Sequence, residues 1–270
     1  MGGLSIFVEI KRCNMIALVG IVAFIGSLLT LFSGFGLGTL LTPVFGMFFP
    51  IHIAIALTGV VHLLNNLFKL SLLGRSAHWS MVRQFGLPSV IGGLLGAWLL
   101  SQLSHLPVLA EWQWNGWRGT ITPLKLVIAL VLVFFTFMEW LPALKNLRFS
   151  ARYLTIGGLF SGFFGGLSGN QGALRSAFLI NSGLDKQRYI ATGVVIACMV
   201  DFTRLPVYFS RFQTAQLQEQ WQVLAVATLC AFIGAWTGNR YLKKATFSMV
   251  QYVTGAMMLI FAVLLAAGVL

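Results

Sequence analysis

Apolar residues in this chain gather in ten runs that short polar or glycine-rich segments separate. The runs cover residues 15–34, 39–49, 51–73, 85–104, 122–141, 153–167, 172–182, 188–209, 220–241 and 246–269. A helix that crosses a bilayer needs about 20 predominantly apolar residues. Two of the runs, around Thr39–Phe49 and Gly172–Leu179, are too short to cross as straight helices. The pattern predicts an all-α, polytopic transmembrane bundle with about eight full spans and two short or re-entrant half-helices.

Composition supports a chain that lipid solvates. Hydrophobic residues make up 58% of the sequence and charged residues 9%, and the mean hydropathy is +0.87. In a soluble domain about a quarter of the residues are charged. This chain has too few charged residues to cover its surface in water. The net charge of +12 does not indicate nucleic-acid binding, because Lys and Arg lie mainly between the apolar runs, as they do in cytoplasmic loops. We therefore expect a multi-pass integral membrane protein.

Two short sequence blocks occur twice. Thr58-Gly-Val-Val61 returns as Thr192-Gly-Val-Val195, and Gly96-Ala-Trp98 returns as Gly234-Ala-Trp236, with offsets of 134 and 138 positions. Nearly equal offsets in the same order indicate a duplicated unit of half the chain. In an apolar protein such duplication is typical of secondary transporters, whose substrate site lies where the halves meet.

We place the first transmembrane repeat at residues 1–144 and the second at 145–270. If both short runs cross the membrane, each repeat has five crossings and the repeats are inverted. If the short runs re-enter, each repeat has four crossings and the repeats are parallel. Inversion puts three basic clusters on one side and the Trp-rich loop Glu111–Arg118 on the other, which the positive-inside rule favours, although Lys11-Arg12 then faces outward. The clusters are Lys69, Arg75 and Arg83; Lys145, Arg148 and Arg152; and Arg240, Lys243 and Lys244.

Each short run follows a glycine-rich segment, residues 33–38 in the first half and 165–172 in the second. Backbone freed from helical structure at membrane depth is tolerated only inside protein or beside a polar cavity. The glycines therefore indicate broken helices around a site. The alternative is that they only allow helices to pack closely.

Arg175 is the most informative charge, because it follows the second break by one helical turn. Unpaired N–H groups at a helix start attract anions, and a guanidinium adds a fork that fits oxyanions. Asn170, Gln171, Gly172 and Ser176 supply further donors around it. We expect these residues to bind substrate. The alternative role for Arg175 is structural, capping carbonyl groups or pairing with an acid.

The matching region of the first half carries no charge. Gly36, Gly38 and Thr39 occupy it, and we include them in the expected substrate site. One cationic and one neutral half would make that site asymmetric.

Ionisable residues inside spans are costly and are functional candidates by default. His62, Asn66 and Lys69 lie in the third run, and Asp201 and Arg204 lie at the corresponding place in the eighth. Superposing the halves pairs Asn66 with Asp201 and Lys69 with Arg204. We expect these five residues to gate the site or couple it to an ion. A structural Asp201–Arg204 pair and a Lys69 that snorkels to the surface are the alternatives.

Enzyme motifs are missing from the sequence. It contains no HExxH, GxSxG or P-loop pattern and no paired-carboxylate site. Cys13, Cys198 and Cys230 are scattered without metal-ligand spacing. We expect no enzymatic activity, no metal and no cofactor.

The two glycine-rich segments, Gly34–Pro43 and Gly162–Arg175, each followed by a Thr-Gly dipeptide, resemble the TauE/SafE sulfite exporter family. The likeness covers almost the whole chain and implies an inner-membrane permease for sulfite, organosulfonates or other small anions. The second segment departs from the family pattern. It reads Ser-Gly-Asn-Gln-Gly before Arg175, and Ala177 stands where the resemblance implies a proline.

Together these features predict a permease that moves a small anion by alternating access between two repeats. An anion channel and a non-transporting membrane scaffold are the alternatives. The expected partners are the anionic substrate and the lipid bilayer, with protons or sodium as candidate coupling ions and no nucleic acid. A homodimer and a monomer are both open.

Overall fold

A computed structural model describes residues 2–33, 36–73, 76–141, 149–179, 182–212, 220–241 and 248–270. Its longer helices are α1 (Gly2–Ser33), α3 (Ile51–Leu73), α5 (Leu87–Ser104), α6 (Pro123–Trp140), α8 (Leu154–Ser168), α10 (Lys186–Arg211), α12 (Trp221–Tyr241) and α13 (Ser248–Ala266). Two short helices, α2 (Leu37–Gly46) and α9 (Gly172–Leu179), fall at the predicted short runs. A helical turn α4 (Trp79–Met81) and a π-helical turn (Val82–Gly86) lead into α5.

The helices have the length and hydropathy of a membrane bundle. Among the residues that the structure describes, five segments are long and apolar enough to span a membrane: Arg12–Leu29, Ile51–Leu72, Trp79–Ser104, Lys186–Arg211 and Trp221–Arg240. Shorter apolar helices cover Leu37–Gly46, Pro123–Met138, Leu154–Ser168 and Tyr252–Ala266. The predicted polytopic all-α class is confirmed.

The chain departs from the prediction at its N-terminal side. The first apolar run begins at residue 15, whereas the helix α1 begins at Gly2, so residues 4–10 are continuous with the first span. Helix α2 also begins and ends earlier than its apolar run, because Gly36 precedes its first turn and a turn at Met47–Pro50 follows it.

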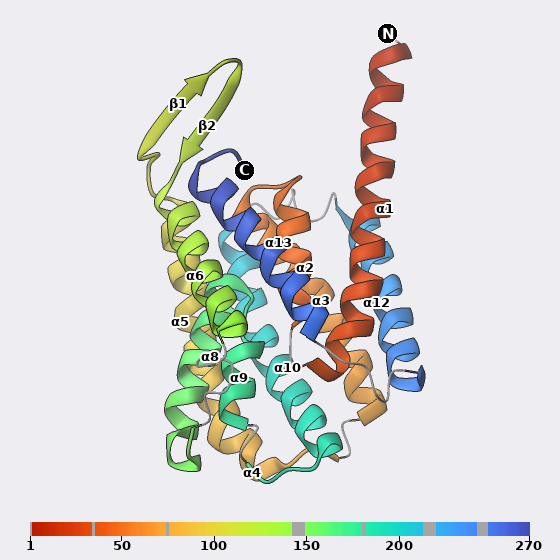
Figure 1. Ribbon diagram of the computed structural model, residues 1–270, viewed down its shortest axis with the longest axis vertical. Coiled ribbons are helices and arrows are strands. Elements are labelled where there is room, and N and C mark those ends of the chain that lie inside the picture. The colour runs from red at the N-terminus through yellow and green to blue at the C-terminus, as the bar shows by residue number, and fades with distance from the viewer. Residues whose placement is uncertain are drawn as a thin grey trace.

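Each short helix folds back on the long helix before it. A Cβ atom on Gly157 near the start of α8 would touch the ring of Phe178 at the end of α9, and Ser161 donates to the carbonyl oxygen of Gln171 (3.1 Å). Helices α8 and α9 therefore form an antiparallel hairpin. Helices α1 and α2 form the second hairpin, which enters from the opposite end of the molecule (Figure 1). The helix directions are thus those expected for inverted repeats.

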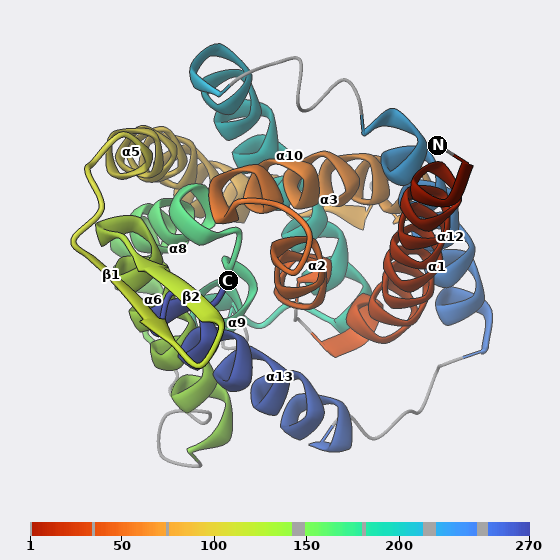
Figure 2. The same cartoon turned by 90° about the horizontal axis from the view of Figure 1, so that it is seen from above.

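The long helices pair across the two halves of the chain. Helix α1 lies along α12, and α8 lies along α5 (Figure 2). A Cβ atom on Gly96 would lie 2.0 Å from the carbonyl oxygen of Phe163, and one on Gly234 would lie 2.3 Å from that of Phe24. Only glycine fits such backbone contact. The repeated Gly-Ala-Trp blocks therefore mark two corresponding close helix contacts.

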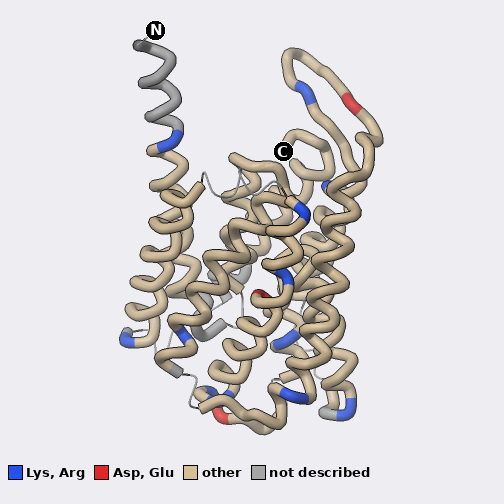
Figure 3. Tube along the Cα trace, turned by 180° about the vertical axis from the view of Figure 1, so that it is seen from behind, with Lys and Arg blue, Asp and Glu red and all other residues tan. Residues whose placement is uncertain are grey.

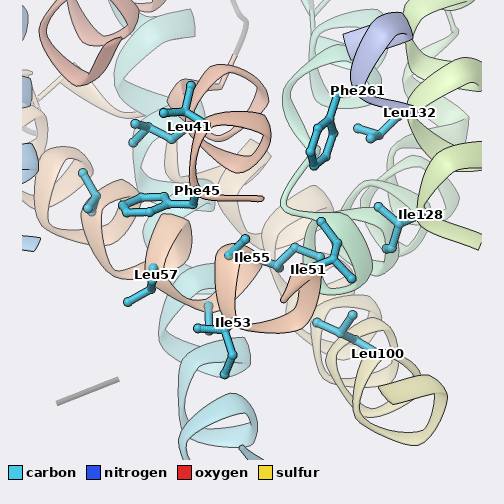
Figure 4. Packing of buried hydrophobic residues seen from close by; sticks show 14 of the residues in the cluster. Leu41, Phe45, Ile51, Ile53, Ile55, Leu57, Leu100, Ile128, Leu132 and Phe261 are labelled. Atoms are coloured by element: carbon cyan, nitrogen blue, oxygen red, sulfur yellow. The ribbon is translucent and has the colours of Figure 1, made fainter. Parts of the chain in front are cut away.

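Helix α2 occupies the centre of the bundle when it is viewed from above (Figure 2). Leu41 and Phe45 of α2 are fully buried and face Ile55 and Leu57 of α3 in one apolar cluster (Figure 4). Phe261 of α13 packs on Gly46 at the end of α2, where a Cβ atom would meet its ring. This packing holds a helix that is too short to span the membrane alone.

The expected Trp-rich loop is a β-hairpin of two antiparallel strands, β1 (Ala110–Trp114) and β2 (Trp117–Ile121). Asn115 and Gly116 form its turn with φ of 49° and 85°. An Asn-Gly pair adopts these positive angles readily, which makes it a strong hairpin signal. The prediction of a loop was wrong because this turn was overlooked.

Basic residues gather at the end of the molecule opposite to the hairpin and the C-terminus (Figure 3). The elements at that end carry Arg83, Arg152, Arg188 and Arg240. The positive-inside rule assigns this end to the cytoplasmic side. Arg12, near the N-terminus, lies toward the other end. Arg75, Lys145, Arg148, Lys243 and Lys244 lie outside the described residues.

Candidate functional site

The tips of the two helical hairpins meet inside the bundle. A Cβ atom on Gly38, at the start of α2, would lie 3.1 Å from the carbonyl oxygen of Gly169, which ends α8. Gly169 has φ of 82°, a left-handed conformation that glycine adopts at helix ends. The two glycine-rich breaks, far apart in the sequence, thus form one region.

Asp201 links this region to the third helix of the first half. Its Oδ2 lies 2.6 Å from Nδ1 of His62, and its Oδ1 accepts from Nε of Arg204 at 2.9 Å. Nη2 of Arg204 also lies 2.8 Å from Oδ1, without hydrogen-bond geometry. The Asp201 and Arg204 side chains are completely buried. We refer to the His62–Asp201 contact as the central link, since it joins α3 to α10.

Arg204 also fixes the end of α8. Its Nη1 donates to the carbonyl oxygen of Gly165 at 3.0 Å. The hydroxyl of Tyr208 donates to the carbonyl oxygen of Gly166. The carbonyl oxygen of Gly165 also accepts from the backbone N–H of Gly169 at 3.0 Å, so the arginine adds a second donor there, at the end of a helix where carbonyl groups lack intrahelical partners. The capping role considered for Arg175 is therefore filled by Arg204. Sequence reasoning missed Tyr208, although it lies four residues after Arg204 on the same helical face.

His62 has further neighbours on its own helix and on the first hairpin. The side-chain amide nitrogen of Asn66 lies 3.1 Å from its Nδ1. A Cβ atom on Gly36 would lie 3.6 Å from its Nε2. Thr39, expected to contact substrate, instead donates to the carbonyl oxygen of Gly36 at 2.7 Å. The structure thus brings Gly36 and Asn66 to His62 and uses the Thr39 hydroxyl locally.

Lys69 is buried rather than directed to the surface, with 5% of the residue exposed. The side-chain amide of Asn65 can be oriented so that both its oxygen and its nitrogen form hydrogen bonds. In that orientation the oxygen accepts from Nζ of Lys69 (3.3 Å), and the nitrogen donates to the carbonyl oxygen of Ala231 (3.2 Å). Within the described part of the chain, no carboxylate lies within ion-pair distance of Lys69. The snorkelling alternative is therefore wrong for this structure.

Arg175 lies against α10. A Cβ atom on Gly193 would be 3.3 Å from its Nε, so the guanidinium fills the space that the glycine leaves. Nη1 of Arg175 is buried and has no hydrogen-bond partner among the described residues. No acid pairs with it there either. Arg204, in contrast, is paired with Asp201.

The residues around Arg175 share this property of its Nη1. The side-chain amides of Asn170 and Gln171 and the hydroxyl of Ser176 are buried and have no hydrogen-bond partner in the described ranges. Gly172, at the start of α9, is buried beside them. Proteins pair nearly all buried polar groups, so such a cluster calls for an explanation. Amide and guanidinium donors arranged in this way can bind an oxyanion.

The described residues hold no group of three His, Cys, Asp or Glu side chains that could bind a metal ion. The chemistry available at the hairpin tips is binding by cationic and amide donors.

Comparison with known proteins agrees with this geometry. A family profile described as sulfite exporter TauE/SafE matches residues 18–265. No curated protein and no solved structure matches the chain. The match and the apolar helices make the protein a multi-pass integral membrane transporter and not an enzyme. From helix α1 to the end of α13, this chain belongs to the TauE/SafE sulfite exporter family.

Proposed function

We propose that the protein transports a small oxyanion, sulfite or a related sulfur-containing oxyanion or organosulfonate, across a bacterial-type inner membrane. The observation that carries this proposal is the half-buried Arg175, whose buried Nη1 has no partner among the described residues, beside the unpartnered side-chain atoms of Asn170, Gln171 and Ser176. An unpaired buried charge is strongly unfavourable, and an anion compensates it.

We also propose that transport proceeds by alternating access between two inverted repeats, residues 1–144 and 145–270. The pairing of α1 with α12 and of α8 with α5 supports this, because the first helix of each half packs on the third long helix of the other half. Substrate sites of such transporters lie near the bilayer midplane, at breaks in helices. Gly38 and Gly169 approach each other at two such breaks.

Two contacts between the halves are suited to act as gates. The central link joins His62 to Asp201. Toward the basic end, the backbone N–H of His78 donates to Oγ1 of Thr192 at 2.9 Å, next to Gly193 and thus next to Arg175. Rocking of one repeat against the other would break one contact while the other holds. His62 and Asp201, with Asn66 beside them, are our candidates for coupling to protons.

Transport by purified protein in liposomes tests this proposal. We expect Arg175→Ala to reduce saturable sulfite flux by about tenfold or more, because charge-assisted hydrogen bonds contribute about 1.5–3 kcal/mol. Arg188→Ala is the matched control, since Arg188 is exposed and paired with Asp185 at 3.4 Å. Unchanged flux of sulfite in Arg175→Ala would remove the proposed site. Flux that does not saturate would favour a channel.

A further inference from the structure

The charges buried between α3, α9 and α10 do not balance. Asp201 is the acid of this region, and Arg204 and His62 already pair with it. Lys69 and Arg175 bring two more cations, and neither has a carboxylate partner in the described part of the chain. A buried charge without a partner of opposite sign strongly destabilises a folded protein. The described residues thus leave Lys69 and Arg175 without a compensating carboxylate.

These two cations lie at the same depth. Helices α3 and α10 are antiparallel, because Gly59 contacts Arg204 while His62 contacts Asp201. Lys69 follows His62 by seven residues, which moves it about 10 Å along α3 at 1.5 Å per residue.

Gly193 precedes Asp201 by eight residues, which moves it about 12 Å along α10 in the same direction. The guanidinium of Arg175 rests on Gly193. Lys69 and Arg175 therefore lie on one side of the central link, toward the basic end.

We propose that Lys69 and Arg175 form one binding site that selects divalent oxyanions over monovalent ions of the same shape. The inference rests on the proposed function and specifies its substrate class. Arg175 donates to the anion from the second half of the chain, and Nζ of Lys69 donates from the first. A dianion neutralises both cations, whereas a monoanion leaves one buried charge uncompensated.

Pairs of anions that differ mainly in charge test the proposal. Sulfate and perchlorate are both tetrahedral, and sulfoacetate and isethionate are both small organosulfonates. We would measure the inhibition of labelled sulfite flux and the shift in melting temperature with each. The divalent member of each pair should bind about tenfold to a hundredfold more tightly. Equal inhibition by perchlorate and sulfate would overturn the inference.

Variants of Lys69 separate its charge from its packing. Lys69→Gln should lower the affinity for sulfate by about tenfold or more and leave that for perchlorate nearly unchanged, and Lys69→Arg should restore the preference for sulfate. Lys125→Gln is the matched control, because the Lys125 ammonium is exposed and bonds to the carbonyl oxygen of Thr120 (2.7 Å).

Failure of this inference differs from failure of the proposed function. If Lys69→Gln behaves as wild type while Arg175→Ala loses flux, the site holds but does not select dianions. If labelled sulfite flux does not saturate in the wild type, or survives Arg175→Ala unchanged, the proposed function itself is wrong.

Discussion

Gly193 leaves the space in which the guanidinium of Arg175 lies, with only 3.3 Å between Nε and the position of a Cβ atom on that glycine. Gly59, the matching residue of the other Thr-Gly-Val-Val block, stands in the same relation to Arg204, at 3.3 Å from Nη2. In both halves, an arginine side chain thus packs against the glycine of the repeated block. The two arginines differ in their partners, because Arg204 bonds to Asp201 and to the carbonyl oxygen of Gly165, whereas Arg175 has no acid partner among the described residues.

This difference predicts opposite consequences for the two glycines. Gly193→Ala should displace the guanidinium of Arg175 by a few tenths of an ångström and weaken sulfite binding, with little change in melting temperature. Gly59→Ala should press on the bonded Arg204 and lower the melting temperature, with a smaller effect on the affinity of folded protein. Sulfite transport assays and thermal unfolding in detergent check both. A larger stability loss in Gly193→Ala than in Gly59→Ala would contradict the assignment.

Substitution of the two arginines should also change the stability of the protein to different extents. Arg204→Gln leaves Asp201 with His62 alone and takes a donor from the carbonyl oxygen of Gly165. Breaking a buried ion pair of this kind costs about 3–5 kcal/mol. Arg175→Gln removes no hydrogen bond to the described protein and should melt close to wild type, measured by the same unfolding assay. Equal destabilisation by the two changes would refute the distinction.

The central link predicts how His62 contributes to coupling. The charged groups that face it are Asp201 and, through Asp201, Arg204, with Lys69 further along its own helix. His62→Gln can keep a hydrogen bond to Asp201 but cannot bind a proton in the physiological range. We expect sulfite flux that no longer responds to a pH gradient in this variant. Accumulation still driven by the gradient would exclude His62 as the proton carrier.

The close helix contacts predict strong effects far from the substrate. Gly96→Ala forces a methyl group against the backbone of α8, and Gly234→Ala does the same against α1. Overpacking of this kind lowers the free energy of unfolding by about 1–3 kcal/mol or more, so the melting temperature of both variants should fall. Leu95→Ala is the control, since Leu95 is 51% exposed on the outer face of α5. Melting temperatures that fall no further than in Leu95→Ala would argue against these contacts.

Cys198 provides a native probe for alternating access. It is buried on α10, three residues before Asp201, while Cys13 is exposed and Cys230 is partly exposed. In a protein that carries Cys13→Ser and Cys230→Ser, an impermeant thiol reagent should reach Cys198 from each side of the membrane. Joining positions 78 and 192 by a cross-link should block labelling from the basic end alone. Labelling that the cross-link leaves unchanged on that side would rule out this gate.

Much of the architecture could be predicted from local pattern. Apolar runs set the helices, because backbone groups in lipid must be paired within each segment. The glycine-rich breaks and the charge of Arg175 one turn beyond them also followed from the sequence. The hairpin at Asn115 and Gly116 was equally accessible and was missed.

The sequence by itself determined that the chain is solvated by lipid, that its helices break twice, and that similar blocks recur in both halves. The tertiary structure decided which charges are satisfied. His62 and Asp201 are 139 residues apart, and their contact assigns Arg204 to structure. It leaves Arg175 and Lys69 without a carboxylate partner among the described residues. Local periodicity specifies a helix because its hydrogen bonds are short-range, whereas ion pairs between helices depend on how the helices pack, which no local pattern encodes.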